Sequence, residues 1–229
     1  VTAKDLIDRG ILATLNIDVV QLEENLEAEY AEYLDEYDKT PQLPSNKRKT
    51  YKQFKDEYLP DFDGEKTYLS GRDDRMMWIA DLIIKNADKP KGNTLCLVNS
   101  IKAGRALSEL IPNSYFVNGQ DVKDPKKRQI VYDKFKDANN LVVVATTHIA
   151  STGLNIRRIF NFVMIDPGQS FIRTIQSIGR GLRKATDKQH VNIVDICSDL
   201  KYSRKHAGQR IKYYNEAGYP HKTRKVPYQ

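Results

Sequence analysis

Short apolar runs rich in β-branched residues alternate with longer amphipathic segments through the last two thirds of this 229-residue chain. The clearest run, at 141–146, reads Leu-Val-Val-Val-Ala-Thr, which is typical of a strand buried on both faces of a sheet. The other predicted strands are 94–99, 114–117, 160–165 and 191–196, and the helices that alternate with them are 101–111, 124–137, 170–184 and 199–217. This alternation predicts an α/β fold with a mostly parallel sheet and helices on both faces.

The N-terminal third has a different pattern. A first strand is predicted at 17–22, and residues 23–37 then carry seven acidic side chains, with tyrosines at helical spacing. Prolines interrupt this helix, and a basic segment follows them to about Tyr58. We therefore expect a helical insertion at about 23–66, which is either a DNA-handling element or a surface hairpin.

Hydroxyl-bearing and glycine-containing loops follow the predicted strands. The segment after 141–146 begins at Thr146 and Thr147 and contains Gly153 and Asn155. In parallel α/β sheets, the loops at the carboxyl ends of the strands gather at the binding crevice. We therefore expect these four residues to lie near one edge of the sheet, together with the helix predicted after 160–165.

Two arginines in that helix are candidate phosphate ligands. The sequence from Gln176 to Arg183 reads Gln-Ser-Ile-Gly-Arg-Gly-Leu-Arg. At this spacing Arg180 and Arg183 share one helix face, with Cβ atoms roughly 5–6 Å apart. Guanidinium groups stay charged and fork onto phosphate oxygens. The pair predicts a polyphosphate site, and the alternative for an isolated R-x-x-R is a solvated helix with two surface arginines.

The positive charge of the chain is concentrated at its C-terminus. Residues 201–229 contain eight Lys or Arg and one acidic residue, a net charge of +7 that equals the formal net charge of the whole chain. Tyrosines interspersed among these cations fit phosphate contact with base stacking. The basic helix and tail at 199–229 therefore predict nucleic-acid contact, with Lys222, Arg224 and Lys225 as candidates. The alternative is a solvated helix that packs its tyrosines on the sheet.

These segments resemble the motifs of the second RecA-like domain of superfamily 2 helicases and translocases. The sequence Thr-Gly-Leu-Asn-Ile at 152–156 is similar to motif V, and 176–183 is similar to motif VI. Residues 95–100 resemble motif IV, and 116–119 with the following helix resemble motif IVa. The forms of motifs V and VI look most like those of a phage recombination and repair helicase. The resemblance extends from Leu69 to the C-terminus.

The resemblance implies roles for individual residues. Arg180 and Arg183 would act as arginine fingers on the γ-phosphate of ATP, and Gly153, Asn155 and Gln176 would lie beside the nucleotide. Asn155 stands where many relatives carry Asp, so it can hydrogen-bond a ribose hydroxyl but adds no charge. The residues that would hold a nucleic-acid strand by its phosphates are Asn99, Ser100, Asn118, Gly119, Thr146 and Thr147. No metal ligand is expected in this chain.

The resemblance also explains what the chain lacks. The sequence contains no G-x-x-x-x-G-K-[ST] phosphate loop and no Asp-Glu-x-His magnesium site, which relatives carry on a first domain. The chain opens on Val1, and we expect residues 1–16 to be the end of a linker from a missing N-terminal RecA-like domain. Residues 17–229 would form the second RecA-like domain. ATP would bind between the two domains, with Mg²⁺ held by the first, and this chain alone would be inactive.

The implied function is that of an ATP-dependent helicase or translocase, acting on branched or single-stranded DNA in recombination or repair. The alternative is a non-catalytic nucleic-acid-binding module that retains the helicase fold. No apolar run approaches the length of a membrane span and no signal peptide opens the chain, so we expect an intracellular, cytoplasmic protein without membrane contact, located in the host cytoplasm if a phage encodes it. Cys96 and Cys197 lie in predicted strands and are expected to be reduced and buried.

Overall fold

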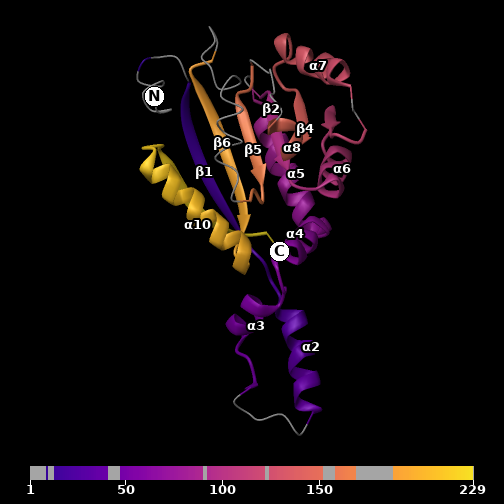
Figure 1. Ribbon diagram of the computed structural model, residues 1–229, viewed down its shortest axis with the longest axis vertical. Helices are drawn as coiled ribbons and strands as arrows, with labels where there is room; N and C mark the ends of the chain where they lie inside the picture. The colour runs from indigo at the N-terminus through magenta and orange to yellow at the C-terminus, as the bar shows by residue number, and fades with distance from the viewer. Residues whose placement is uncertain are drawn as a thin grey trace.

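A seven-stranded sheet forms the centre of the computed structural model (Figure 1). The structure describes residues 9, 13–40, 47–89, 92–121, 124–151, 158–168 and 188–228. The strands lie in the order β3-β4-β2-β5-β6-β1-β7, and every neighbouring pair is parallel. Their bounds are β1 Thr14–Glu23, β2 Thr94–Val98, β3 Ser114–Val117, β4 Val142–Thr146, β5 Asn161–Ile165, β6 His190–Ser198 and β7 His221–Pro227. The predicted α/β fold with a parallel sheet is therefore confirmed.

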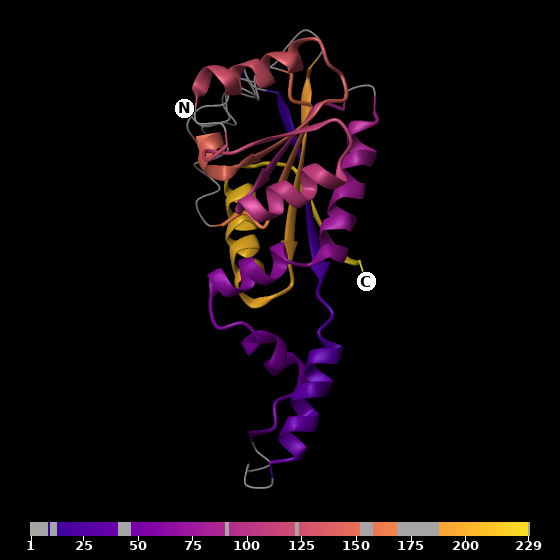
Figure 2. The same ribbon diagram turned by 90° about the vertical axis from the view of Figure 1, so that its right-hand side faces the viewer.

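Strands β2, β4 and β5 are almost wholly buried because helices cover both faces of the sheet there. Every residue of β2 and β5 is buried, as are all residues of β4 except its last. One face packs against α5 (Asp73–Ala87) and α6 (Ile101–Leu110). The other face packs against α10 (Lys201–Glu216), α7 (Pro125–Asp133) and the 3₁₀ helix Lys134–Lys136 that continues α7. Figure 2 shows α10 and α5 on opposite sides of the sheet.

Helix α6 lies very close to β3 because a glycine stands at their contact. An added Cβ at Gly104 would lie 2.2 Å from Cε2 of Phe116, a distance at which the ring or the helix must shift. Glycine normally weakens a helix interior, so the close packing against Phe116 explains why position 104 is a glycine.

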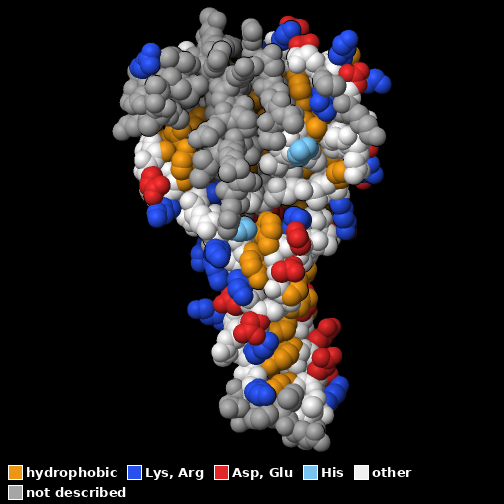
Figure 3. Space-filling model, viewed as in Figure 1, with side chains coloured by type: hydrophobic (Ala, Val, Ile, Leu, Met, Phe, Trp, Pro, Cys, Tyr) orange, Lys and Arg blue, Asp and Glu red, His pale blue; other side chains and the backbone are white. Residues whose placement is uncertain are grey.

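The N-terminal insertion contributes α2 (Glu27–Asp38), α3 (Tyr51–Glu57) and α4 (Phe62–Ser70). Helices α2 and α3 project beyond the carboxyl end of β1 as a stalk, along which hydrophobic side chains form a line (Figures 1 and 3). The ring centroid of Tyr30 lies 5.9 Å from that of Tyr33 and 5.3 Å from that of Phe54, so aromatic packing holds the stalk together.

Helix α4 joins the insertion to the main body. The carboxylate of Glu65 accepts hydrogen bonds from the backbone N–H groups of Tyr202 (2.9 Å) and Ser203 (2.5 Å), in the first turn of α10. Burial of this carboxyl raises its pKa, while the two hydrogen bonds oppose the rise. Lys55 of α3 adds an ion pair with Asp199 at 2.7 Å, so the insertion is fixed at the start of α10.

Three elements differ from the sequence-based expectation. Residues 147–151, expected as a loop, form the short helix α8 (Thr147–Ser151). The C-terminal tail ends in β7, an additional strand beside β1. The helix expected at 170–184 lies outside the described residues.

Two further observations concern the whole described chain. Cys96 and Cys197 are buried, unpaired thiols, and burial raises the pKa of Cys197 to about 12. Within the described ranges, none of the helices has the length and apolar character needed to cross a membrane.

Candidate functional site

The carboxyl ends of parallel strands bring the predicted strand-contacting residues to one edge of the sheet. The ends of β2, β3 and β4 carry these residues directly: Asn99, Ser100, Asn118, Gly119, Thr146 and Thr147. The next strand, β5, ends at Ile165, and Asp166 follows it on the same edge. The loops therefore lie side by side as the motif order predicts, and the roles of these residues remain predictions.

Hydrogen bonds join three of these strand ends. The hydroxyl of Thr147 lies 3.0 Å from Oδ1 of Asn99 and 3.2 Å from the backbone carbonyl of Val98, and can donate to either. The amide nitrogen of Asn99 donates to the backbone carbonyl of Asp166. Asp166 has a φ of 45°, so its backbone adopts the left-handed region that few non-glycine residues occupy. Asn99 therefore positions the loops after β4 and β5.

Asn118 has its side chain turned into the protein. Its Oδ1 accepts hydrogen bonds from the N–H groups of Gln120 and Asp121, both at 2.9 Å, and its amide donates to Asp121 at 2.8 Å. The hydrogen bond from Asn118, with further help from Arg105, lowers the pKa of the Asp121 carboxyl. The buried amide of Asn118 therefore holds the turn after β3. Of the two predicted strand-contacting residues here, Asn118 and Gly119, only Gly119 is exposed.

A buried ionic cluster lies behind the edge. The guanidinium of Arg75 donates to both oxygens of Asp166, at 2.7 and 2.8 Å, and to Glu24 at 3.2 Å. Tyr228 donates to the other oxygen of Glu24. Burial raises the pKa of the Glu24 carboxyl, and the charge of Arg75 opposes that rise. Sequence reasoning missed this cluster. The available signal was the position of Arg75, four residues before Ile79 on the buried face of α5.

A second buried arginine fixes the turn after β5. Arg210 of α10 donates to both oxygens of Asp195, each at 2.8 Å, and to the carbonyl of Pro167 at 2.7 Å. Tyr214 donates to the same carboxylate at 2.9 Å, and burial raises the pKa of this phenol. Arg210 was counted with the basic C-terminal segment, but it is 2% exposed and serves the interior.

The predicted basic tail is part of the sheet. Lys222, Arg224 and Lys225 all lie in β7, which runs beside β1 in the register that pairs Asp18 with Lys222. Arg224 donates from Nε to Asp18 at 3.1 Å, and Lys222 lies 3.9 Å from the same carboxylate. Because side chains alternate along a strand, Lys225 faces the opposite side of the sheet from Lys222 and Arg224.

Five predicted nucleotide-site residues lie outside the described residues: Gly153, Asn155, Gln176, Arg180 and Arg183. Among the residues that the structure describes, no group of three His, Cys, Asp or Glu side chains is arranged to hold a metal ion. The described part of the site is therefore the carboxyl edge and the buried arginines behind it.

Comparison with known proteins finds similarity to helicases in the main segment of the chain. Residues 74–185 match the helicase conserved C-terminal domain. The ATP-dependent DNA helicase uvsW of Enterobacteria phage T4 is 29% identical over 171 residues, which cover 70% of this chain and 33% of uvsW. The chain thus spans about a third of the length of the curated relative that it matches.

Solved structures share the fold. The crystal structure of T4 UvsW superposes with a TM-score of 0.66 at 22% identity, covering 94% of this chain and 42% of that one. The C-terminal part of the Fun30 ATPase domain superposes with a TM-score of 0.55 at 11% identity, covering 86% of this chain and 90% of that one. The type ISP restriction-modification enzyme LlaBIII, in a structure bound to DNA, gives a TM-score of 0.57 at 12% identity, covering 99% of this chain and 16% of that one.

Proposed function

We propose that this chain supplies one half of an ATP-dependent DNA helicase or translocase of superfamily 2. Residues 74–185 match the helicase conserved C-terminal domain, and the chain is similar to uvsW. The observation that carries the proposal is the coincidence of the matched segment, 74–185, with motifs IV to VI in their expected order. ATP binds in the cleft between this domain and a first RecA-like domain that provides the phosphate loop and holds Mg²⁺.

Arg180 and Arg183 act on the nucleotide as arginine fingers. They reach the γ-phosphate and stabilise the charge that develops in the transition state, an effect worth roughly 10³–10⁵ in rate in other nucleotide hydrolases. Gly153, Asn155 and Gln176 contact the rest of the nucleotide. Because the phosphate loop stands on the other domain, hydrolysis requires both domains to be closed on one ATP.

The carboxyl edge holds a DNA strand by its phosphates. Hydroxyls of Ser100, Thr146 and Thr147 and the backbone of Gly119 donate to phosphate oxygens, while Asn99 and Asn118 fix the loops that carry them. Such contacts position a strand without reading its sequence. Opening and closing of the ATP cleft then moves this grip along the strand.

Branched or single-stranded DNA is the proposed substrate, in recombination or repair. The experiment is the ATPase rate of the full-length protein with forked, single-stranded and duplex DNA of equal length. Stimulation is expected by the first two above the level given by blunt duplex. A full-length protein that binds DNA but hydrolyses no ATP with any of them would be a non-catalytic binding module, and the proposal would be wrong.

A further inference from the structure

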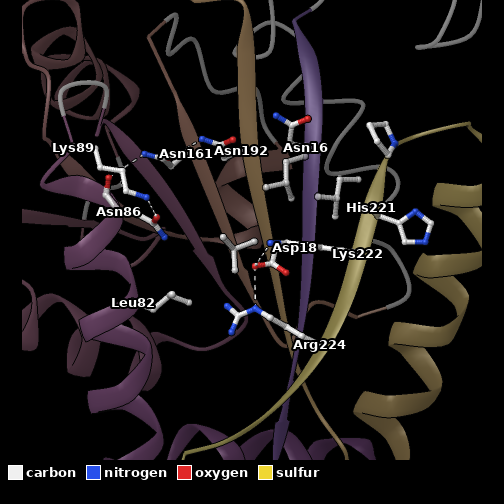
Figure 4. A pocket seen from close by; sticks show the side chains of 14 residues that line it. Asn16, Asp18, Leu82, Asn86, Lys89, Asn161, Asn192, His221, Lys222 and Arg224 are labelled. Atoms are coloured by element: carbon white, nitrogen blue, oxygen red, sulfur yellow. Dashed lines mark hydrogen bonds and ion pairs between the residues drawn. The ribbon is translucent and has the colours of Figure 1, made fainter.

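A groove lies on the α5 side of the sheet, at the amino-terminal half of the strands (Figure 4). Its volume is about 540 Å³, and it is lined by residues from β1, β5, β6, β7 and α5. Along β1, the distance from Asn16 in the groove to Glu23 at the carboxyl edge is roughly 23 Å at about 3.3 Å per residue. The groove is therefore separate from the carboxyl edge that is proposed to hold a DNA strand.

A row of asparagines forms the floor of this groove. Asn16 of β1 is in register with Asn192 of β6, and Asn192 is in register with Asn161 of β5. Asn192 donates to Oδ1 of Asn161 at 3.2 Å. Asn161 is 3% exposed, whereas Asn16 and Asn192 are exposed although their strands lie inside the sheet.

This polar row is unusual for a parallel sheet. Asparagine is depleted in strands, and parallel sheets are normally covered by helices on both faces. On the same face of β6, Val194 and Ile196 follow Asn192 and pack under α5, so the cover ends where the asparagines begin. Departures from local preference that bring no packing gain are expected at functional positions.

Cations surround the row. Lys89 lies just beyond the C-terminal end of α5, and Lys222 and Arg224 lie on β7 at the other side (Figure 4). Asp18 is the only acidic residue among the fourteen that line the groove. Asp18 holds Arg224 through Nε, which leaves the two terminal guanidinium nitrogens directed along the groove.

We infer that this groove binds the sugar–phosphate backbone of a second segment of nucleic acid, in addition to the strand at the carboxyl edge. Asparagine, lysine and arginine side chains are the usual donors to phosphate oxygens in sequence-independent contacts. A peptide would more typically add to the sheet edge as a further strand, and Pro227 on β7 disfavours that mode. The inference rests on the proposed function, since it assigns a second contact on the same substrate.

Two matched pairs of variants test the groove. Asn192→Asp places a carboxylate in the groove, and Asn215→Asp places one on an exposed position of α10, on the opposite side of the sheet. Lys89→Gln removes a groove cation, and Lys85→Gln removes an exposed lysine of α5 that does not line the groove. Within each pair the net charge changes equally, so non-specific electrostatic effects cancel.

The readout is fluorescence anisotropy of a labelled duplex, measured with the 229-residue chain and with the full-length protein at several salt concentrations. Asn192→Asp is expected to weaken binding about 5-fold or more at low salt relative to Asn215→Asp, since a like charge at about 4 Å repels this strongly even in water. Lys89→Gln is expected to lower the slope of log affinity against log salt by roughly 0.7–0.9 relative to Lys85→Gln.

Equal binding within both pairs, with circular dichroism showing intact folding, would overturn the inference. Loss of binding to an oligoglutamate peptide in the groove variants, with DNA binding intact, would overturn it in favour of an acidic protein partner. Either failure is distinguishable from failure of the proposed function, because the latter is decided by the DNA-stimulated ATPase rate of the unmodified full-length protein.

Discussion

Replacement of Arg75 by Met should strongly destabilise the fold. The guanidinium of Arg75 lies 3.2 Å from the carboxylate of Glu24 and 2.7 Å from that of Asp166. The side chains of Arg75 and Glu24 are 0% exposed, and that of Asp166 is 13% exposed. Methionine fills much of the same volume but leaves two buried carboxylates without their cation. Breaking a buried ion pair in this way costs roughly 3–5 kcal/mol of unfolding free energy.

The loss should depend on pH in a defined direction. Burial already raises the pKa of Glu24 above its ordinary value of 4.5, and the charge of Arg75 opposes that rise. Without Arg75 the folded state holds a proton that the unfolded state releases, so the variant loses stability as the pH rises from 4.5 through the raised folded pKa. The difference between variant and parent should therefore shrink as the pH is lowered toward the ordinary value.

The assay is urea and thermal unfolding of the chain followed by circular dichroism, at about pH 7 and about pH 5. The midpoint temperature should fall by roughly 6–20 °C, from about 2–4 °C per kcal/mol for a domain of this size. Arg105→Met, which breaks an exposed pair with Asp121, is the matched control and should change little. Equal effects of the two substitutions, or a loss of stability that grows at low pH, would show that the buried Arg75 pairs do not stabilise the fold in this way.

Two further outcomes are expected. Gly104→Ala should destabilise the chain by roughly 1–3 kcal/mol because the new Cβ would meet the ring of Phe116. Gly208→Ala on α10 should stabilise it by about 1 kcal/mol, since the new Cβ meets nothing within 4 Å. Urea unfolding measures both changes, and a change of the same sign in the two variants would contradict the prediction. The isolated chain should show no ATPase above background, since its sequence has no phosphate loop. Turnover by the purified chain that Arg183→Ala abolishes would show a complete site and contradict this prediction, whereas turnover that survives the substitution would come from contamination.

Strands β2 to β5 could be predicted closely because their sequences are short, mostly apolar runs. The runs at 94–99, 114–117, 141–146 and 160–165 match β2 to β5 within a residue at each end. Strands β2, β4 and β5 are buried on both faces, and even the edge strand β3 keeps an apolar run, Tyr-Phe-Val. The helices between them predict that these strands are parallel. Parallel strands place Asn99, Asn118 and Thr147, which follow their carboxyl ends, at one edge of the sheet.

Strand β7 could not be predicted because its sequence is charged and its partner is distant. His-Lys-Thr-Arg-Lys-Val-Pro presents few apolar residues, as a solvated tail does. It pairs with β1, about two hundred positions earlier, and Arg224 forms an ion pair with Asp18 of that strand. An edge strand needs only one half-buried face, so the periodicity that reveals buried strands is weak there.

Buried charges escaped the sequence argument for a related reason. Counting Arg210 as part of a basic surface was wrong, because its partner Asp195 lies on a neighbouring element and the pair is visible only in three dimensions. Arg75 likewise pairs with Glu24 and Asp166, which are far away in the sequence. The asparagine row was missed because its members become neighbours only through strand register.

The proposed arginine-finger role of Arg183 can be measured in the steady-state ATPase of the full-length Arg183→Ala protein with DNA present. We expect a kcat lower by on the order of 10³ or more, with a modest change in nucleotide affinity, because a finger acts mainly in the transition state. Arg183→Lys should recover little, since a point charge does not replace the planar fork. A kcat close to that of the parent protein in either variant would mean that Arg183 is not an arginine finger.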